Sequence, residues 1–260
     1  MSRQDYPENV SGAALVTGAG QRIGAQTARY LAQRGIRVVL HVNQSRQAAD
    51  AIAAEINQAG GQAAVLQADL ANPETWQTLF EQAVDAVGPV TVLINNASLF
   101  EADDAPDMRR EMWAAHMAVN LEAPVFLARA LYNALPEDRT GVVINMIDQR
   151  VWRLNPSFFS YTISKAGLWT ATQTLAQGLA PRVRVAGIGP GPTLQNARQR
   201  PEDFQAQIDG LPLKRGATPA DITRAIGFIL DSPAFTGQML AIDGGQHLAW
   251  ETPDIAGIPE

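Results

Sequence analysis

Short apolar runs alternate along the chain with longer segments in which apolar residues recur at helical spacing. Seven such runs lie at residues 13–19, 36–42, 63–69, 90–98, 141–148, 183–189 and 237–243. Several, such as "VTVLINNAS" and "VRVAGIG", are apolar at successive positions, which is typical of parallel strands covered by helices on both faces. Seven strands alternating with helices predict a doubly wound, seven-stranded parallel α/β sheet of the Rossmann type.

The length and composition favour one domain. At 260 residues the chain matches a single α/β unit, so we expect one domain over 1–260 with its core at about 12–245. Cysteine is absent, and the three histidines show no ligand spacing, so neither a disulfide nor a metal site is expected. The N-terminus has no apolar leader, and no apolar run approaches the roughly 20 residues of a membrane span. A net charge of −6 without a basic run argues against nucleic acid. We therefore expect a cytoplasmic protein with a small-molecule substrate.

The segment "TGAGQRIG" (17–24) follows the first predicted strand. Gly18 and Gly20 permit a tight turn there, and Gly24 lets the next helix approach the strand. Backbone N–H groups at that helix start would then face a pyrophosphate, and Ile23 belongs to the same predicted cofactor site. Arg22 opposes the helix dipole, so we expect it to face an anion or a carbonyl oxygen; the alternative is a solvent-exposed side chain.

The end of the second predicted strand indicates which dinucleotide binds. NAD enzymes usually place an acid there, but none occurs before Asp50. Asn43 and Ser45, the latter at a predicted helix start, could hold a 2′-phosphate instead. The sequence thus favours NADP(H) over NAD(H), with Asp69 placed to meet the adenine.

Tyr161 and Lys165 share one helix face at i and i+4. A free tyrosine has a pKa near 10, and a neighbouring ammonium would move that pKa toward neutrality, as a proton donor requires. Asn120 is a polar residue within a largely apolar helix. It either disturbs that helix or anchors a water that relays protons to Lys165.

These motifs resemble the short-chain dehydrogenase/reductase family across about residues 12–245. The matching segments are "TGAGQRIG", "NNAS" (95–98), Asn120, "YTISK" (161–165), "GPGPT" (189–193) and "IDGG" (242–245). The resemblance implies that Asn95 and Ala97 lie along the cofactor and that Pro190 and Thr193 surround the nicotinamide. It also implies a homotetramer or homodimer, packed through the helices of Asn120 and Tyr161.

Two positions depart from the usual family pattern. Arg22 stands where the family usually has glycine, and Asp148 stands thirteen residues before Tyr161 where it usually has serine. Together with Phe100, these departures resemble the pteridine reductase and dihydromonapterin reductase branch. There, the residues matching Arg22, Ser98, Phe100, Asp148, Tyr161 and Lys165 line the site. Gln44 departs from that branch, which tends to have arginine at this position, and residues 149–155 have no counterpart that we can assign.

Asp148 favours particular chemistry. An ionised carboxylate only accepts hydrogen bonds, so beside the oxyanion of a reduced ketone it would repel where a donor is needed. In reduction of a C=N bond it could stabilise a protonated nitrogen or pass on a proton. It would also raise the pKa of Tyr161 and titrate with it as a unit. The alternative is that Asp148 caps the following loop. For Phe100 the alternative to stacking a flat ligand is simple packing.

The expected function is transfer of hydride from NADPH to a planar, pterin-like C=N substrate. Tyr161 donates the proton, assisted by Asp148 and Lys165, and the segment at 190–217 forms a lid or substrate loop. One alternative is a carbonyl reductase or alcohol dehydrogenase of unknown substrate. A non-catalytic NADP-binding sensor is the other, although it would have no need to retain Tyr161, Lys165 and Asn120.

Overall fold

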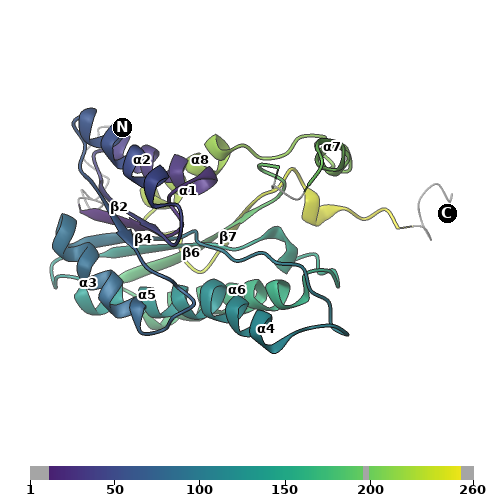
Figure 1. Ribbon diagram of the computed structural model, residues 1–260, viewed down its shortest axis with the longest axis horizontal. Helices are drawn as coiled ribbons and strands as arrows, with labels where there is room; N and C mark the ends of the chain where they lie inside the picture. The colour runs from purple at the N-terminus through teal and green to yellow at the C-terminus, as the bar shows by residue number, and fades with distance from the viewer. Residues whose placement is uncertain (1–11, 196–198, 253–260) are drawn as a thin grey trace.

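Seven parallel strands form one sheet in the computed structural model, which describes residues 12–195 and 199–252 (Figure 1). The strands are β1 (Ala13–Val16), β2 (Arg37–Val42), β3 (Ala63–Gln67), β4 (Val90–Asn95), β5 (Gly141–Met146), β6 (Val183–Pro190) and β7 (Met239–Ile242). Their order is β3-β2-β1-β4-β5-β6-β7, which reverses direction between β1 and β4. The predicted doubly wound, seven-stranded α/β fold is confirmed. In such sheets ligands bind beyond the carboxyl ends of the strands at this switch point.

Helices cover both faces of the sheet. They are α1 (Arg22–Gln33), α2 (Arg46–Gln58), α3 (Thr75–Val87), α4 (Arg110–Met117), α5 (Ala123–Ala134), α6 (Phe159–Gly178), α7 (Pro201–Asp209) and α8 (Pro219–Asp231). The described residues also form short helical turns: η2 (Ala118–Glu122) and η3 (Gln149–Val151) lie between helices, and η4 (Gln246–Leu248) follows β7. Figure 1 shows α1, α2 and α8 on one face and α3, α5 and α6 on the other. Within the described ranges, no helix has the length and apolar character needed to cross a membrane.

The core has two layers, one on each side of the sheet. Leu31 of α1 and Ile226 of α8 pack with strand residues on one side, while Phe80 of α3 and Leu127 of α5 do so on the other. The strands are apolar on both faces for this reason, and β4 and β5 are buried at every position. Four strands, β1, β3, β4 and β5, end two or three residues before their predicted limits, where the chain turns toward the site, whereas β2 ends at its predicted limit.

A π-helical turn, η2, joins α4 to α5 and contains Asn120. Asn120 was expected to disturb its helix, and the helix is indeed widened by one π-helical turn at this residue. Such turns occur frequently at functional sites, since they shift the helix register locally.

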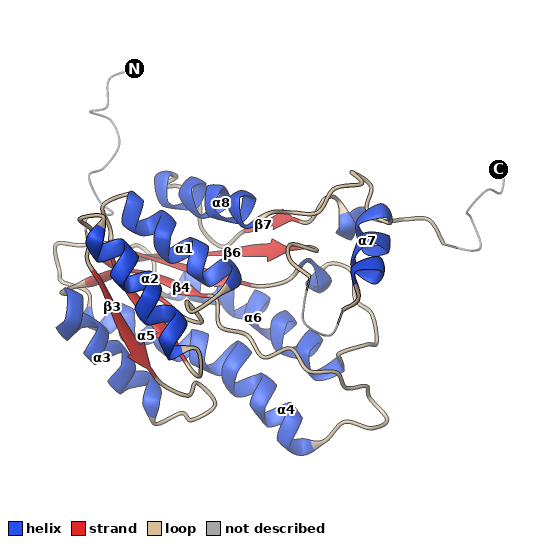
Figure 2. Cartoon of the chain, turned by 45° about the horizontal axis from the view of Figure 1, so that its top comes forward, coloured by secondary structure: helices blue, strands red, loops and turns tan. Residues whose placement is uncertain are grey.

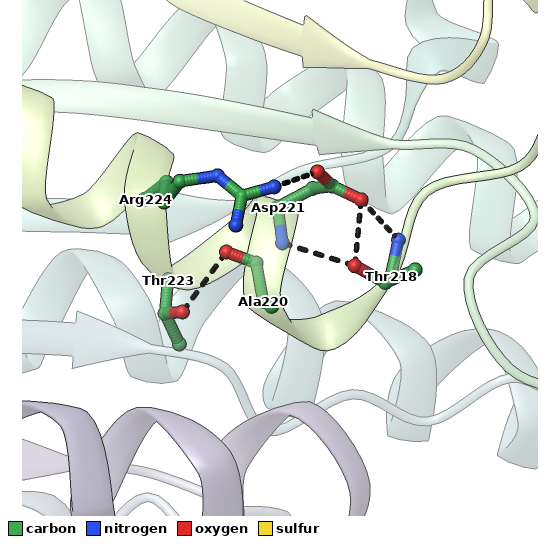
Figure 3. A network of polar contacts seen from close by, with 5 residues as sticks. All are labelled: Thr218, Ala220, Asp221, Thr223 and Arg224. Atoms are coloured by element: carbon green, nitrogen blue, oxygen red, sulfur yellow. Dashed lines mark hydrogen bonds and ion pairs between the residues drawn. The ribbon is translucent and has the colours of Figure 1, made fainter.

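The segment from 190 to 217 is not wholly irregular, because it contains α7 beyond the carboxyl ends of β6 and β7 (Figure 2). It ends at a capping box that starts α8 (Figure 3). Thr218 Oγ1 accepts a hydrogen bond from Asp221 N at 3.2 Å, and Asp221 Oδ2 accepts one from Thr218 N at 2.8 Å. Arg224 pairs with the same carboxylate. The reciprocal bonds satisfy two donors at the helix start and fix where this segment rejoins the core.

Candidate active site

Two neighbouring cavities open beyond the carboxyl ends of the strands. The first, about 680 Å³, is lined by the glycine-rich turn and the ends of β2 and β4; we call it the glycine-loop cavity. The second, about 300 Å³, is lined by residues following β4, β5 and β6; we call it the Tyr161 cavity. Arg22, Ile23, Asn96 and Ser98 line both. The cavities are therefore adjacent, as a long ligand spanning the switch point would require.

The glycine-rich turn has no room for side chains at two positions. A Cβ on Gly24 would lie 2.2 Å from Gly18 O, and a Cβ on Gly20 would lie 2.1 Å from Ser45 Oγ. Gly24 therefore lets α1 lie close to the backbone of Gly18, and Gly20 leaves the space that the side chain of Ser45 occupies. Ser45 precedes α2 as expected, but its side chain makes no capping hydrogen bond; it lines the glycine-loop cavity instead.

His41, whose role sequence analysis missed, supports this turn from beneath. Its Nδ1 accepts a hydrogen bond from Gly18 N at 3.3 Å, and its Nε2 lies 3.1 Å from Ala68 O. Burial lowers the pKa of His41 to about 4, so the ring is neutral at physiological pH and can accept through Nδ1 while Nε2 donates. The only sequence signal was a polar residue inside the apolar run "IRVVLHV".

The predicted nucleotide-selecting residues line the glycine-loop cavity. Asn43, Gln44 and Ser45 follow β2, and Asp69 lies across from them, with Asn43 Nδ2 donating to Asp69 Oδ1 at 3.4 Å. The carboxylate of Asp69 also accepts from Ala71 N at 2.9 Å, which fixes its orientation. The residues after β2 are thus uncharged hydrogen-bond donors, at the place where an NAD-dependent enzyme usually has an acidic residue that binds the ribose.

Asn95 does not contribute its side chain to either cavity, contrary to expectation. Its Nδ2 donates to Asn145 Oδ1 at 2.8 Å, in the buried interior between β4 and β5. The next residue, Asn96, lies at the cavity and donates through Nδ2 to Thr17 O and Gly18 O at 2.8 and 3.0 Å. The motif was located correctly, but Asn95 still belongs to the strand and turns inward, whereas Asn96 and Ala97 face the cavity.

The Tyr161 cavity brings together most of the predicted reaction residues. Its wall includes Arg22, Ser98, Phe100, Asp148, Tyr161, Lys165, Pro190 and Thr193. These residues come from several separate segments of the chain. Asn120 lies behind this wall, fully buried.

Asp148 makes both of the contacts that its sequence position suggests as alternatives, one with the Tyr161 hydroxyl and one with the backbone of the following loop. Tyr161 Oη donates to Asp148 Oδ2 at 2.8 Å, while Asp148 Oδ1 accepts from Arg150 N at 2.8 Å and caps η3. The cap therefore fixes the carboxylate and aims its second oxygen at the phenol. Burial raises the pKa of Asp148, an effect only partly offset by these hydrogen bonds and by the cationic groups of Arg150 and Lys165.

The phenol is held strongly in its protonated form. Burial raises the pKa of Tyr161 well above its usual range, and the negative charge of Asp148 raises it further. Lys165 Nζ donates to Met146 O at 2.7 Å and lies 5.8 Å from the centroid of the Tyr161 ring. Burial lowers the pKa of Lys165 to about 8. The groups that lower the pKa of Tyr161 are Arg150 and Ser98, not Lys165 as expected, and they are outweighed, so the phenol stays protonated.

Asn120 anchors the segment after β4. Its Oδ1 accepts from Leu99 N at 2.8 Å, and its Nδ2 donates to Leu99 O at 2.9 Å and to Ser164 Oγ at 3.1 Å. Leu99 lies between Ser98 and Phe100, so this amide positions both. The amide thus makes three hydrogen bonds to protein groups, and its part in a water relay to Lys165 stays a prediction.

An aromatic cluster forms one wall of the Tyr161 cavity. Phe100 stacks on Phe158 with ring centroids 4.2 Å apart and an angle of 12° between the planes, and it meets Tyr161 edge-on at 4.6 Å. Phe158 has φ of 58°, an unfavourable left-handed conformation for a bulky residue that the start of α6 holds in place. The guanidinium of Arg150 lies 5.6 Å from the Phe158 ring centroid. Sequence analysis missed Phe158 and Arg150, since neither belongs to a motif.

Arg22 faces carbonyl oxygens, one of its two expected environments. Its guanidinium donates to Leu194 O at 2.9 Å and to Gln195 O at 2.8 Å, joining the glycine-rich turn to the segment after β6. From that segment Leu194, Phe204 and Gln207 also line the Tyr161 cavity. The described part of this segment therefore contributes to the cavity wall, and its role as a lid stays a prediction.

No three His, Asp or Glu side chains among residues 12–195 and 199–252 come together in an arrangement that could hold a metal ion. The Tyr161 cavity contains the Asp148–Tyr161 pair and the cations around it. These groups can deliver one proton to a ligand in the Tyr161 cavity.

Comparison with known proteins agrees with this geometry. A curated relative, the 3-oxoacyl-[acyl-carrier-protein] reductase of Synechocystis, is 34% identical over 238 residues, covering 89% of this chain and 95% of its own. Among solved structures, the FolM alternative dihydrofolate reductase 1 of Brucella canis, in complex with NADP, is 51% identical with a TM-score of 0.92. The match covers 95% of this chain and 97% of that one. The Brucella suis protein of the same name, also with NADP, gives 51% identity and a TM-score of 0.91 over 94% and 98%. The short chain dehydrogenase family model matches residues 12–205, and the chain belongs to this family of oxidoreductases.

Proposed function

We propose that this protein is an NADPH-dependent reductase of a planar C=N heterocycle of the pterin type. The observation that carries the proposal is the 2.8 Å hydrogen bond from Tyr161 Oη to Asp148 in a cavity also lined by Lys165 and Phe100. The two Brucella structures are similar across nearly the whole chain, and both are described as alternative dihydrofolate reductases with NADP. Their similarity supports the same cofactor and substrate class here.

The glycine-loop cavity fits a dinucleotide phosphate. At Gly24 the absence of a side chain leaves room for the backbone of Gly18. Asn43 and Ser45, both uncharged hydrogen-bond donors, lie where a 2′-phosphate would need donors. Asn43, Ser45 and the turn at Gly18 would hold the adenylate half, and Pro190 and Thr193 would border the nicotinamide. When bound, NADPH supplies the hydride that adds to carbon.

Tyr161 supplies the proton that nitrogen requires. Its raised pKa keeps the hydroxyl protonated across the physiological range but also makes it a weak acid, so donation requires that the resulting phenolate be stabilised. Donation would leave a phenolate beside Asp148, and two adjacent anions are unfavourable. The raised pKa of Asp148 lets this carboxyl hold a proton and return it to Tyr161. The pair thus manages one proton as a coupled unit, with Lys165 stabilising the anionic charge that remains.

The direct experiment is the steady-state oxidation of NADPH with a 7,8-dihydropterin and with a panel of ketones. We expect the dihydropterin to be turned over, and Tyr161→Phe to reduce kcat by about 10²- to 10⁴-fold with NADPH affinity nearly unchanged. Absence of dihydropterin turnover at every pH tested would refute the proposal.

Carbonyl reduction is the second candidate, supported by the raised pKa of Asp148 and by the similarity to a 3-oxoacyl reductase. A protonated Asp148 is a donor and could stabilise a developing oxyanion. Ketone turnover by this route would be confined to pH values below the pKa of Asp148. Because dihydropterin turnover as proposed also draws on a proton held by Asp148, the ratio of kcat/KM for the dihydropterin to that for the ketones separates the two candidates.

We also propose a homotetramer or homodimer packed through the helices of Asn120 and Tyr161. Phe126 of α5 and Ile163 of α6 support this, since their apolar side chains are 44% and 40% exposed in the single chain. Light scattering on the purified protein would measure the state, and a monomer at micromolar concentration would contradict it.

A further inference from the structure

Gln149, the first residue of η3, lies directly after Asp148 in the wall of the Tyr161 cavity. Its backbone packs against β6, where a Cβ on Gly189 would lie 3.3 Å from Gln149 N. Its backbone oxygen accepts from Trp152 N at 2.9 Å, which closes the helical turn. The position of this residue is therefore fixed from both sides, by β5 and by β6.

The side chain of Gln149 is buried, and its carboxamide oxygen has no hydrogen-bond donor among the described residues. Only 7% of the residue is exposed, and its Oε1 accepts no hydrogen bond from any residue that the structure describes. A buried carboxamide oxygen without a donor is unfavourable, and buried amides nearly always find one. If packing alone mattered at this position, an apolar residue of similar size would be more stable than glutamine, because it would leave no polar atom unpaired.

Because Gln149 lines the cavity, rotation of its terminal carboxamide would turn this buried oxygen toward a ligand there, and the ligand can supply the missing donor. The ring edge of a pterin carries an amino group and a lactam N–H, both hydrogen-bond donors. We propose that Gln149 is a specificity-determining residue whose Oε1 accepts a hydrogen bond from the amino-lactam edge of the substrate. This inference rests on the proposed function and deepens it, because it says which part of the heterocycle this chain recognises. Asp148 and Tyr161 manage the proton, while Gln149 distinguishes an amino-substituted ring from a plain ketone.

Other glutamines in the same wall do not share this feature. Gln207 on α7 is exposed, and its Oε1 accepts from Gln199 Nε2 at 3.1 Å. It lines the same cavity with its acceptor already engaged. Gln207 therefore provides a matched control for the loss of a glutamine from this site.

The test compares two substrates in three proteins: wild type, Gln149→Met and Gln207→Met. The substrates are 7,8-dihydropterin and its analogue with oxygen in place of the 2-amino group, which turns a donor into an acceptor. We expect wild type and Gln207→Met to prefer dihydropterin by about 10- to 100-fold in kcat/KM, the range of one buried hydrogen bond. Gln149→Met should lose this preference, mainly through KM, with NADPH affinity unchanged.

The possible outcomes separate the two proposals. Turnover of neither pterin by wild type would refute the proposed function and this inference with it. Turnover of both at equal efficiency by wild type, or an undiminished preference in Gln149→Met, would overturn the inference alone. Equal turnover of the two substrates by wild type would therefore refute the inference even if Gln149→Met does not fold.

Discussion

Replacing Asp148 by asparagine removes the negative charge from the proton-delivery pair while preserving its shape. The carboxamide oxygen introduced by Asp148→Asn can still accept from Arg150 N, so the cap of η3 is retained. The bond lost is the one from Tyr161 Oη to Oδ2, because an amide nitrogen at that place cannot accept.

A hydrogen bond to a charged group is worth about 1.5–3 kcal/mol, which corresponds to a rate factor of roughly 10 to 150 if it acts in the transition state. We therefore expect Asp148→Asn to reduce kcat with 7,8-dihydropterin by about that factor. Turnover of ketones should fall by a smaller factor than turnover of dihydropterin, or should rise. The amide introduced by Asp148→Asn can donate a hydrogen bond to a developing oxyanion, which the carboxylate could not.

The same substitution changes the dependence of stability on pH. Since burial raises the pKa of Asp148 in the folded state, its carboxyl stabilises the fold at low pH, and this contribution is lost as the pH rises through the folded pKa. Asp148→Asn should therefore have a higher Tm than wild type at pH 8, with the difference closing toward pH 4.

Stopped-flow NADPH oxidation and thermal melts between pH 4 and pH 9 would measure both effects. Asp148→Ser, which introduces the residue usual in the family, provides a second variant that should lose dihydropterin activity and gain ketone activity. Dihydropterin kcat within twofold of wild type in both variants would refute the proposed role of the carboxylate.

Three further substitutions, and one control, test the surrounding structure. Gly24→Ala, whose Cβ would lie 2.2 Å from Gly18 O, should raise the NADPH Kd more than tenfold by fluorescence titration. Gly178→Ala, with no atom within 4 Å of its Cβ, should leave it unchanged. Arg150→Met removes a cation that lowers the pKa of the Asp148–Tyr161 pair, so the pH–rate profile should move to higher pH; an unshifted profile would contradict this. Thr218→Ala breaks the capping box and should lower stability by about 1 kcal/mol, or Tm by about 2–4 °C, measured by calorimetry; an unchanged Tm would argue against the cap.

Much of the fold could be predicted from the periodicity of the sequence. Strands buried on both faces leave an unbroken apolar signature, and β4 and β5 coincide with such runs. Their exact ends could not be predicted, because the last residues of each run already belong to the turn at the cavity. This is why Asn95 was assigned to the cofactor although its side chain points into the core.

Tyr161, Lys165 and Asp148 could be proposed as reaction residues because they occupy fixed positions in a motif, and the structure brings them into the wall of one cavity. Gln149, Arg150 and Phe158 could not be placed, since their roles depend on a single helical turn and a left-handed backbone conformation. No local pattern in the sequence specifies either feature. The direction of the pKa shift of Tyr161 also required the structure, because it depends on burial as well as on nearby charge.

The central claim is that Tyr161, backed by Asp148, delivers a proton to a ring nitrogen. The most direct measurement is a crystal structure of the ternary complex with NADP⁺ and a dihydropterin. We expect Tyr161 Oη within about 3.2 Å of the nitrogen of the reducible C=N bond, while it remains hydrogen-bonded to Asp148. A ring bound with that nitrogen turned away from Tyr161, or an Asp148 carboxylate facing bulk water, would contradict the account.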